Sequence, residues 1–151
     1  METPEQILNL VDQRIREAKI LLENGEADGA FYLAGYSVEL ILKWKVCQNF
    51  EIPNLYANKN LPTIDGVKKL KNATYTHNLY SLLLFSGLRK KFDKEKVNNT
   101  KLQKANSLLF SCWNENVRYK PCNHKETKDV EDLLTLLTDT KTGLIRWIKE
   151  N

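Results

Sequence analysis

The side chains best suited to chemistry form a polar stripe in an otherwise apolar segment, residues 30–47. At helical spacing, one face of this segment carries Tyr32, Tyr36, Glu39 and Lys43. A helix that is apolar nearly all round is the central helix of its domain, so its polar groups must find partners elsewhere in the chain. Tyrosine rings at the edge of a groove can also stack a nucleotide base. The stripe therefore predicts either a polar network in the core or a ligand-binding groove.

The elements that would position this stripe are helices. Thr3, Pro4 and Gln6 have the spacing of a capping box, and Asn24–Gly25 is a conventional helix end. The short spacer that follows predicts that this first helix packs antiparallel to the central one. Gly35 lowers the helix propensity of the central helix, and we expect the close approach of another backbone to compensate.

The helical pattern is interrupted between residues 49 and 76, a stretch with two prolines, several asparagines and no sustained period. We expect an irregular excursion here, with one short helix near Asp65–Lys71. The helical signal returns with Thr76 as the predicted cap and His77 in the first turn, where it would hydrogen-bond locally. Ser86–Gly87 predicts the end of that helix.

Two further helices complete the predicted fold. One runs from about Asn99 to Trp113 with Cys112 on its apolar face. The last has Thr127 as its predicted cap and carries Ile148 on its buried side. No segment alternates at period two over the length of a strand. The chain is therefore predicted to be a single all-α domain over residues 1–151, an up-down bundle of four long helices with one or two short ones.

Composition indicates which partners and which cellular compartment suit the protein. The chain has 151 residues and a formal net charge of +4, which is compatible with nucleic acid or acidic partners. Three cysteines at no framework spacing suit a reducing compartment, and neither a signal peptide nor a membrane-spanning run is recognisable. Cys122 and His124, even with Cys112 or His77 recruited, match no zinc signature. We expect a cytoplasmic protein with no membrane segment, no bound metal and no cofactor.

Three segments together resemble one family of proteins. AFYLAGYSVELILKWKVC resembles the second helix of HEPN domains (higher eukaryote and prokaryote nucleotide-binding). THNLYSLL resembles the Thr-His-acidic-Leu segment that opens the third helix of that family, and WNENVRYKP resembles the Trp-…-Arg-Tyr-x-Pro segment after its fourth helix. The three matches occur in the order that the family shows, so the resemblance covers most of the chain.

The resemblance implies a helical bundle, usually a homodimer, that acts on RNA or nucleotides. Members work in toxin–antitoxin, phage-defence or RNA-processing systems, in some cases beside a nucleotidyltransferase-like partner. The active branch is similar to metal-independent ribonucleases, whose mark is an arginine and a histidine with four to six residues between them. Arg118 and His124 fit that spacing. In this role His124 would move protons, Arg118 would stabilise the charged phosphorane, and Tyr119, Lys120 and Lys125 would hold the RNA.

A non-catalytic interpretation is equally specific. Ribonuclease members commonly carry a polar residue after the arginine, where this chain has Tyr119, and Pro121 disfavours a helix at the residue before it. In this alternative, Arg118 forms a buried ion pair with Glu39, Tyr119 joins the polar stripe, and His124 is an exposed residue ahead of the last helix. The protein would then bind a nucleotide, RNA or a partner protein through the groove along the stripe.

Overall fold

The computed structural model describes residues 3–57 and 64–151, and all regular elements within these ranges are helical. The predicted all-α class is confirmed. Residues 58–63 of the predicted excursion lie outside the described residues. In chain order the elements are α1 (Pro4–Glu23), α2 (Ala27–Asn49), α3 (Asp65–Thr74), α4 (Leu79–Phe85), α5 (Arg89–Glu95), α6 (Thr100–Ala105), the π-helical turn η1 (Asn106–Phe110), the 3-10 turn η2 (Glu115–Tyr119), α7 (Thr127–Thr138) and α8 (Leu144–Glu150).

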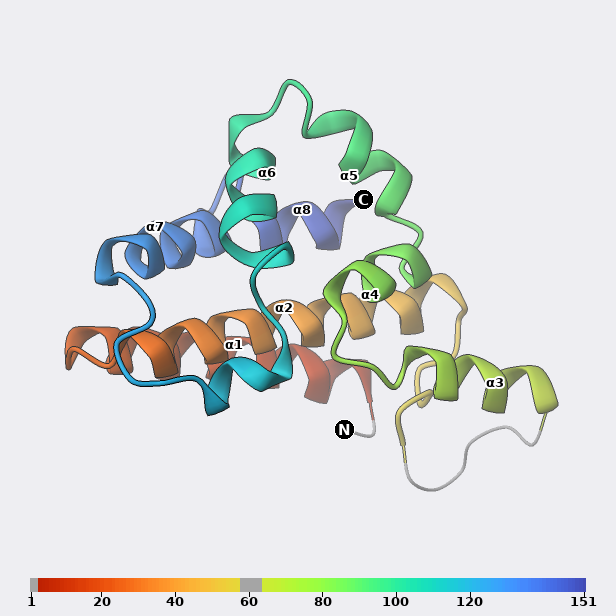
Figure 1. The fold of residues 1–151 in the computed structure, drawn as a ribbon. Helices are drawn as coiled ribbons and strands as arrows, with labels where there is room; N and C mark the ends of the chain where they lie inside the picture. The colour runs from red at the N-terminus through yellow and green to blue at the C-terminus, as the bar shows by residue number, and fades with distance from the viewer. Residues whose placement is uncertain (1–2, 58–63) are drawn as a thin grey trace.

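α1 and α2 form a long antiparallel hairpin against which α4, η2, α7 and α8 pack (Figure 1). The predicted capping box is present: the Thr3 hydroxyl accepts from the backbone N–H of Gln6 at 3.2 Å, and the Gln6 side chain accepts from the N–H of Thr3. Such a cap stabilises a helix by about 1 kcal/mol. Asn24 ends α1, and Gly25 reverses the chain in the left-handed region that glycine tolerates, at φ 83°.

α2 is the central helix, as the apolar composition of its segment predicts. It contacts α1, α4, α7, α8 and η2 (Figure 1). Val38, Leu40, Ile41, Leu42 and Val46 of this helix are fully buried, and each contributes roughly 1.5–3 kcal/mol of hydrophobic stabilisation. Because other elements cover α2 on most sides, a charged residue on this helix is shielded from water and needs a partner within the protein.

Trp113 packs directly on Gly35, on the polar side of α2. A Cβ atom at Gly35 would lie 2.2 Å from the indole ring, so only glycine leaves room for it. The indole Nε1 donates a hydrogen bond to the backbone carbonyl of Tyr32 at 3.0 Å. The predicted close approach at Gly35 therefore occurs, but the prediction of a second backbone there is wrong, because the group that approaches is a side chain.

The segment between α3 and α4 differs from its prediction in one respect that concerns function. α3 agrees with the expected short helix, but Asn78, and not Thr76, caps α4 by accepting from the N–H of Ser81 at 2.8 Å. The hydroxyl of Thr76 instead accepts from the N–H of Asn78 at 3.1 Å, which forms a turn. His77 consequently lies before α4 and not in its first turn, and its side chain reaches α2.

The segment after Asn99 is helical but irregular. The helix begins close to the predicted start, with Asn99 as the cap of α6, and it then widens into the π-helical turn η1, in which the N–H of Ser111 donates to the carbonyl of Asn106 at 3.0 Å. The wider turn changes the direction of the residues that follow it. Cys112 is consequently exposed, whereas regular helical spacing places it on the apolar face. That prediction is wrong.

The predicted last helix is divided into α7 and α8. The carboxylate of Asp139 accepts from the N–H groups of Lys141 at 3.0 Å and Thr142 at 2.7 Å, which stabilises a turn where the helix would otherwise continue. At Gly143 a Cβ would lie 2.5 Å from the carbonyl oxygen of Asp139. The N-cap of α7 is Glu126 rather than Thr127.

Candidate functional site

The polar stripe of α2 is longer than its sequence pattern indicates, because Asp28 belongs to it. Asp28 and Glu39 are eleven residues apart. At 100° and 1.5 Å per residue they lie on the same face, separated by about three turns or roughly 16 Å. Tyr32 and Tyr36 occupy the face between them. Each of the two carboxylates contacts one histidine, and each histidine comes from a loop far away in the chain.

Asp28 holds the loop that contains the predicted catalytic histidine. Its carboxylate accepts from the backbone N–H of Asn123 at 2.6 Å and of Lys125 at 2.9 Å, with a longer contact of 3.4 Å to the N–H of His124. Partial burial acts to raise the pKa of Asp28, but these N–H groups and the nearby imidazole outweigh it and hold the pKa below its ordinary value. The loop is therefore fixed by one charged side chain in the first turn of α2.

His124 is largely buried, with 16% of its side chain exposed, and its Nδ1 lies 2.9 Å from Oδ1 of Asp28. The alternative interpretation that His124 is an exposed residue is wrong, because Asp28 draws the loop onto α2. The Nδ1 contact is close but poorly aligned for a hydrogen bond, so the attraction is mainly electrostatic. Nε2 is shielded from solvent and has no hydrogen-bond partner among the described residues. A buried, unpaired ring nitrogen is costly and is a natural position for a ligand contact.

Arg118 is exposed and does not contact Glu39. It lies at the end of η2, where its guanidinium stacks over the ring of Tyr119 at 4.9 Å and reaches the hydroxyl of Tyr32 at 3.4 Å. The alternative of a buried Arg118–Glu39 ion pair is wrong, because the carboxylate of Glu39 already has two other partners. Tyr119 is 73% exposed and does not join the polar stripe, which corrects that part of the alternative too.

Arg118 and His124 line one hollow of about 280 Å³, together with Asp28, Tyr32 and Lys120. We call this the Arg118 hollow. It brings together both predicted catalytic residues and two of the predicted RNA-binding residues. Lys125 lies elsewhere, with its ammonium group 4.0 Å from the centre of the Phe31 ring. The sequence-based prediction did not include Asp28. Its sequence signal is weak, namely a carboxylate one helical turn before Tyr32.

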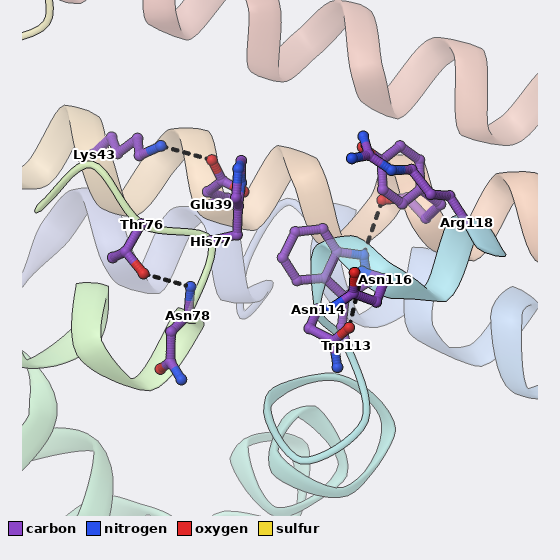
Figure 2. A network of polar contacts seen from close by, with 10 residues as sticks. Glu39, Lys43, Thr76, His77, Asn78, Trp113, Asn114, Asn116 and Arg118 are labelled. Carbon is purple, nitrogen blue, oxygen red and sulfur yellow. Dashed lines mark hydrogen bonds and ion pairs between the residues drawn. The ribbon is translucent and has the colours of Figure 1, made fainter. Parts of the chain in front are cut away.

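The other end of the stripe is a buried charge network (Figure 2). Oε1 of Glu39 pairs with the ammonium group of Lys43 at 2.7 Å, and Oε2 lies 2.8 Å from Nδ1 of His77. The rings of Tyr56 and Tyr75 cover Lys43 at 5.8 and 5.6 Å. Glu39 and Lys43 are 1% and 5% exposed, so a ligand has no direct access to them. The accessible member is His77, half of whose side chain is exposed.

Aromatic rings separate the two histidines. Tyr32 stacks on Tyr36 with ring centroids 6.4 Å apart and on Trp113 at 6.1 Å. In Figure 2, Trp113 lies between His77 and Arg118. Burial and the neighbouring Glu39 raise the pKa of Tyr36, which therefore keeps its proton at neutral pH. The face of α2 thus has two separate polar ends with half-buried tyrosines between them.

Within residues 3–57 and 64–151, no three histidine, cysteine or carboxylate side chains lie close enough to hold a metal ion together. Over the same ranges, no helix is both long and apolar enough to cross a membrane. Comparison with family models, with curated proteins and with solved structures gave no match to this chain.

Proposed function

We propose that this protein is a HEPN-like, metal-independent ribonuclease that cleaves RNA in the Arg118 hollow. One observation carries the proposal: Arg118 and His124 line the same hollow, and the carboxylate of Asp28 lies at Nδ1 of the His124 imidazole. A carboxylate in this position orients a histidine and stabilises its protonated form. In this proposal, Asp28 joins the pair of Arg118 and His124 that the family resemblance indicated, and it orients His124.

The chemistry needs only groups that these residues and the RNA supply. Nε2 of His124 removes the proton of the ribose 2′-OH, whose oxygen then forms a bond to phosphorus while the bond from phosphorus to the 5′ oxygen breaks. The imidazolium returns its proton to the leaving 5′ oxygen, so that the products are a 2′,3′-cyclic phosphate and a 5′-hydroxyl. Arg118 forks onto the non-bridging oxygens as negative charge develops on them. Because Nε2 is shielded in the free protein, RNA binding must open the hollow to this nitrogen while Nδ1 stays beside Asp28.

We base the RNA-holding residues, the homodimer and the partner protein on the family resemblance. Lys120, which lines the hollow, and the exposed Tyr119 would hold the strand beside the scissile phosphate, with Lys125 further along the loop. We propose a homodimer and an antitoxin or nucleotidyltransferase-like partner, in a bundle of the family's up-down type. The net charge of +4 supports an anionic ligand.

The test is RNA cleavage by the purified protein in EDTA, with analysis of the product ends. We expect cyclic phosphate ends from the wild type and a loss of roughly 100-fold or more in Arg118→Ala and His124→Ala. Arg16→Ala is the matched control, since Arg16 is an exposed arginine on α1. Circular dichroism should show each variant folded. Intact RNA with the wild type, or undiminished cleavage by both variants, contradicts the proposal.

The second candidate is a non-catalytic module that binds a nucleotide, RNA or a partner protein along α2. The stacked and only partly buried rings of Tyr32 and Tyr36 favour it, because such rings can accept a base. Glu39 and Lys43 would form the buried base of this groove. Because their charges neutralise one another, they do not need a charged ligand. RNA binding without cleavage, weakened in Tyr36→Leu, would favour this candidate over the ribonuclease.

A further inference from the structure

A second hollow, of about 450 Å³, lies beside His77 at the other end of the polar face. Side chains from two segments line it: the turn before α4 supplies Thr76, His77 and Asn78, and the chain around the start of η2 supplies Asn114, Glu115 and Asn116. We call it the His77 hollow. The labelled residues of Figure 2 show these two segments facing one another. None of its groups has a role in the proposed cleavage.

The hydrogen bonds already made by the two asparagines define what they offer a ligand. Oδ1 of Asn78 accepts from the N–H of Ser81 at 2.8 Å, and Oδ1 of Asn114 accepts from the N–H of Asn116 at 2.9 Å. With the oxygens engaged as caps, each asparagine is left with an amino group, and neither amino group has an acceptor among the described residues. Both asparagines line the hollow, so it offers two amide donors whose rotation the caps restrict.

His77 and Glu115 complete the set of groups. Glu39 holds Nδ1 of His77, so Nε2 is the ring nitrogen left for a ligand. Glu115 is partly buried, and within the described part of the chain its carboxylate has no ion pair or hydrogen bond. An unpaired carboxylate repels a phosphate group, so the hollow does not suit a simple anion. It suits a ligand edge that carries carbonyl oxygens for the amide donors and an N–H group for the carboxylate.

Among the RNA bases, guanine and uracil have such an edge, because each carries a carbonyl next to a ring N–H. Adenine has no carbonyl, and the ring nitrogen beside the carbonyl of cytosine is an acceptor. We infer that the His77 hollow recognises a guanine or uracil base of the bound RNA. This inference rests on the proposed function. The two carboxylates of α2 are roughly 16 Å apart, so His77 cannot reach the phosphate at the Arg118 hollow and contacts a neighbouring nucleotide.

The test is binding of the four ribonucleoside 5′-monophosphates to the full chain in EDTA, measured by calorimetry. GMP and UMP should bind roughly tenfold more tightly than AMP and CMP, the discrimination expected of a well-formed pair of base contacts. Glu115→Ala removes the acceptor for the base N–H and should abolish this preference. Glu131→Ala, at an exposed glutamate on α7, is the matched control and should keep it. Equal binding of all four nucleotides by the wild type, or a preserved preference in Glu115→Ala, overturns the inference.

A second variant distinguishes an effect on base recognition from an effect on folding. Asn78→Ser retains an oxygen that can cap α4 but removes the amide donor, so GMP and UMP should bind several-fold more weakly while the helix content is unchanged. Undiminished binding by this variant also counts against the inference. RNA cleavage is scored independently: cleavage without base preference defeats the inference alone, whereas base preference without cleavage defeats the proposed ribonuclease alone.

Discussion

Asp28 and Glu39 stand about three turns apart on one face of α2, and each contacts a histidine that lies far away in the sequence. The partner of Asp28 is 96 residues away and that of Glu39 is 38 residues away. The central helix therefore acts as a template that positions two loops.

Replacing Asp28 should affect both the loop and the proposed reaction. Asp28→Asn removes the negative charge and places an amino group where backbone N–H groups and His124 need an acceptor. Because hydrogen bonds to a charged group contribute about 1.5–3 kcal/mol each, we expect the free energy of unfolding to fall by roughly 1–3 kcal/mol. Cleavage should fall on the order of 100-fold. Urea unfolding and cleavage assays measure the two effects, and unchanged values in both would contradict the assigned role of Asp28.

The same carboxylate predicts how stability depends on pH. The pKa values of Asp28 and Asp139 are lowered in the folded protein, Asp28 despite some burial and Asp139 chiefly by the N–H and hydroxyl groups of Thr142. A lowered folded pKa contributes stability above the unfolded pKa, about 3.9, and that contribution is lost as pH falls through the folded pKa. Urea unfolding should show a decline below about pH 4. The decline should be smaller in Asp28→Asn, and an identical decline would refute this explanation.

Glycine is required at position 35 but not at position 66. Gly35→Ala would place a Cβ 2.2 Å from the ring of Trp113, so the indole must move and lose its bond to the Tyr32 carbonyl. We expect a loss of about 1–3 kcal/mol in the free energy of unfolding and a shift in tryptophan fluorescence. Gly66→Ala, in α3 with nothing within 4 Å, is the control and should be neutral or stabilising by about 0.4–1 kcal/mol. Equal effects of the two substitutions would show that the Trp113 contact is unimportant.

The buried charge network should respond unequally to the loss of its members. Glu39→Gln leaves the ammonium group of Lys43 buried without a countercharge, which typically costs 3–5 kcal/mol. His77→Ala removes a half-exposed partner and should cost about 1 kcal/mol or less. Combining Glu39→Gln with Lys43→Met removes the unpaired charge and should recover much of the loss. Chemical denaturation measures all three, and no recovery in the double variant would argue against the ion pair.

The three cysteines should differ in reactivity toward iodoacetamide. Cys112 and Cys122 are exposed, whereas Cys47 is buried on α2, and burial raises the pKa of its thiol to about 11. Because the thiolate is the reactive form, the native protein should lose two thiols quickly and the third only after unfolding. Mass spectrometry of the modified peptides identifies each site. Rapid modification of Cys47 in the native protein would contradict its burial.

Local features of the chain were predictable because local interactions determine them. The capping box at Thr3 and Gln6, the helix end at Asn24–Gly25 and the apolar composition of α2 all depend on a few neighbouring residues, and the structure contains each of them. The same reasoning failed at Cys112 and at the α7–α8 break. At these two places a π-helical turn and the turn stabilised by Asp139 interrupt the regular helix. Neither turn changes the average helix propensity of its segment, so the sequence pattern does not reveal it.

At the candidate site, too, some features follow from the sequence and others depend on the tertiary structure. The sequence alone identified the candidate residues, namely the polar stripe of α2 and the spacing of Arg118 and His124. Only the tertiary structure decided their partners: Asp28 for His124, His77 for Glu39, and Tyr32 and Tyr119 for Arg118. Periodicity reports which side of a helix is buried, but it carries no information on which distant loop closes over that side. That choice depends on the packing of the whole chain, because a buried charge takes whichever partner the folded backbone brings within reach.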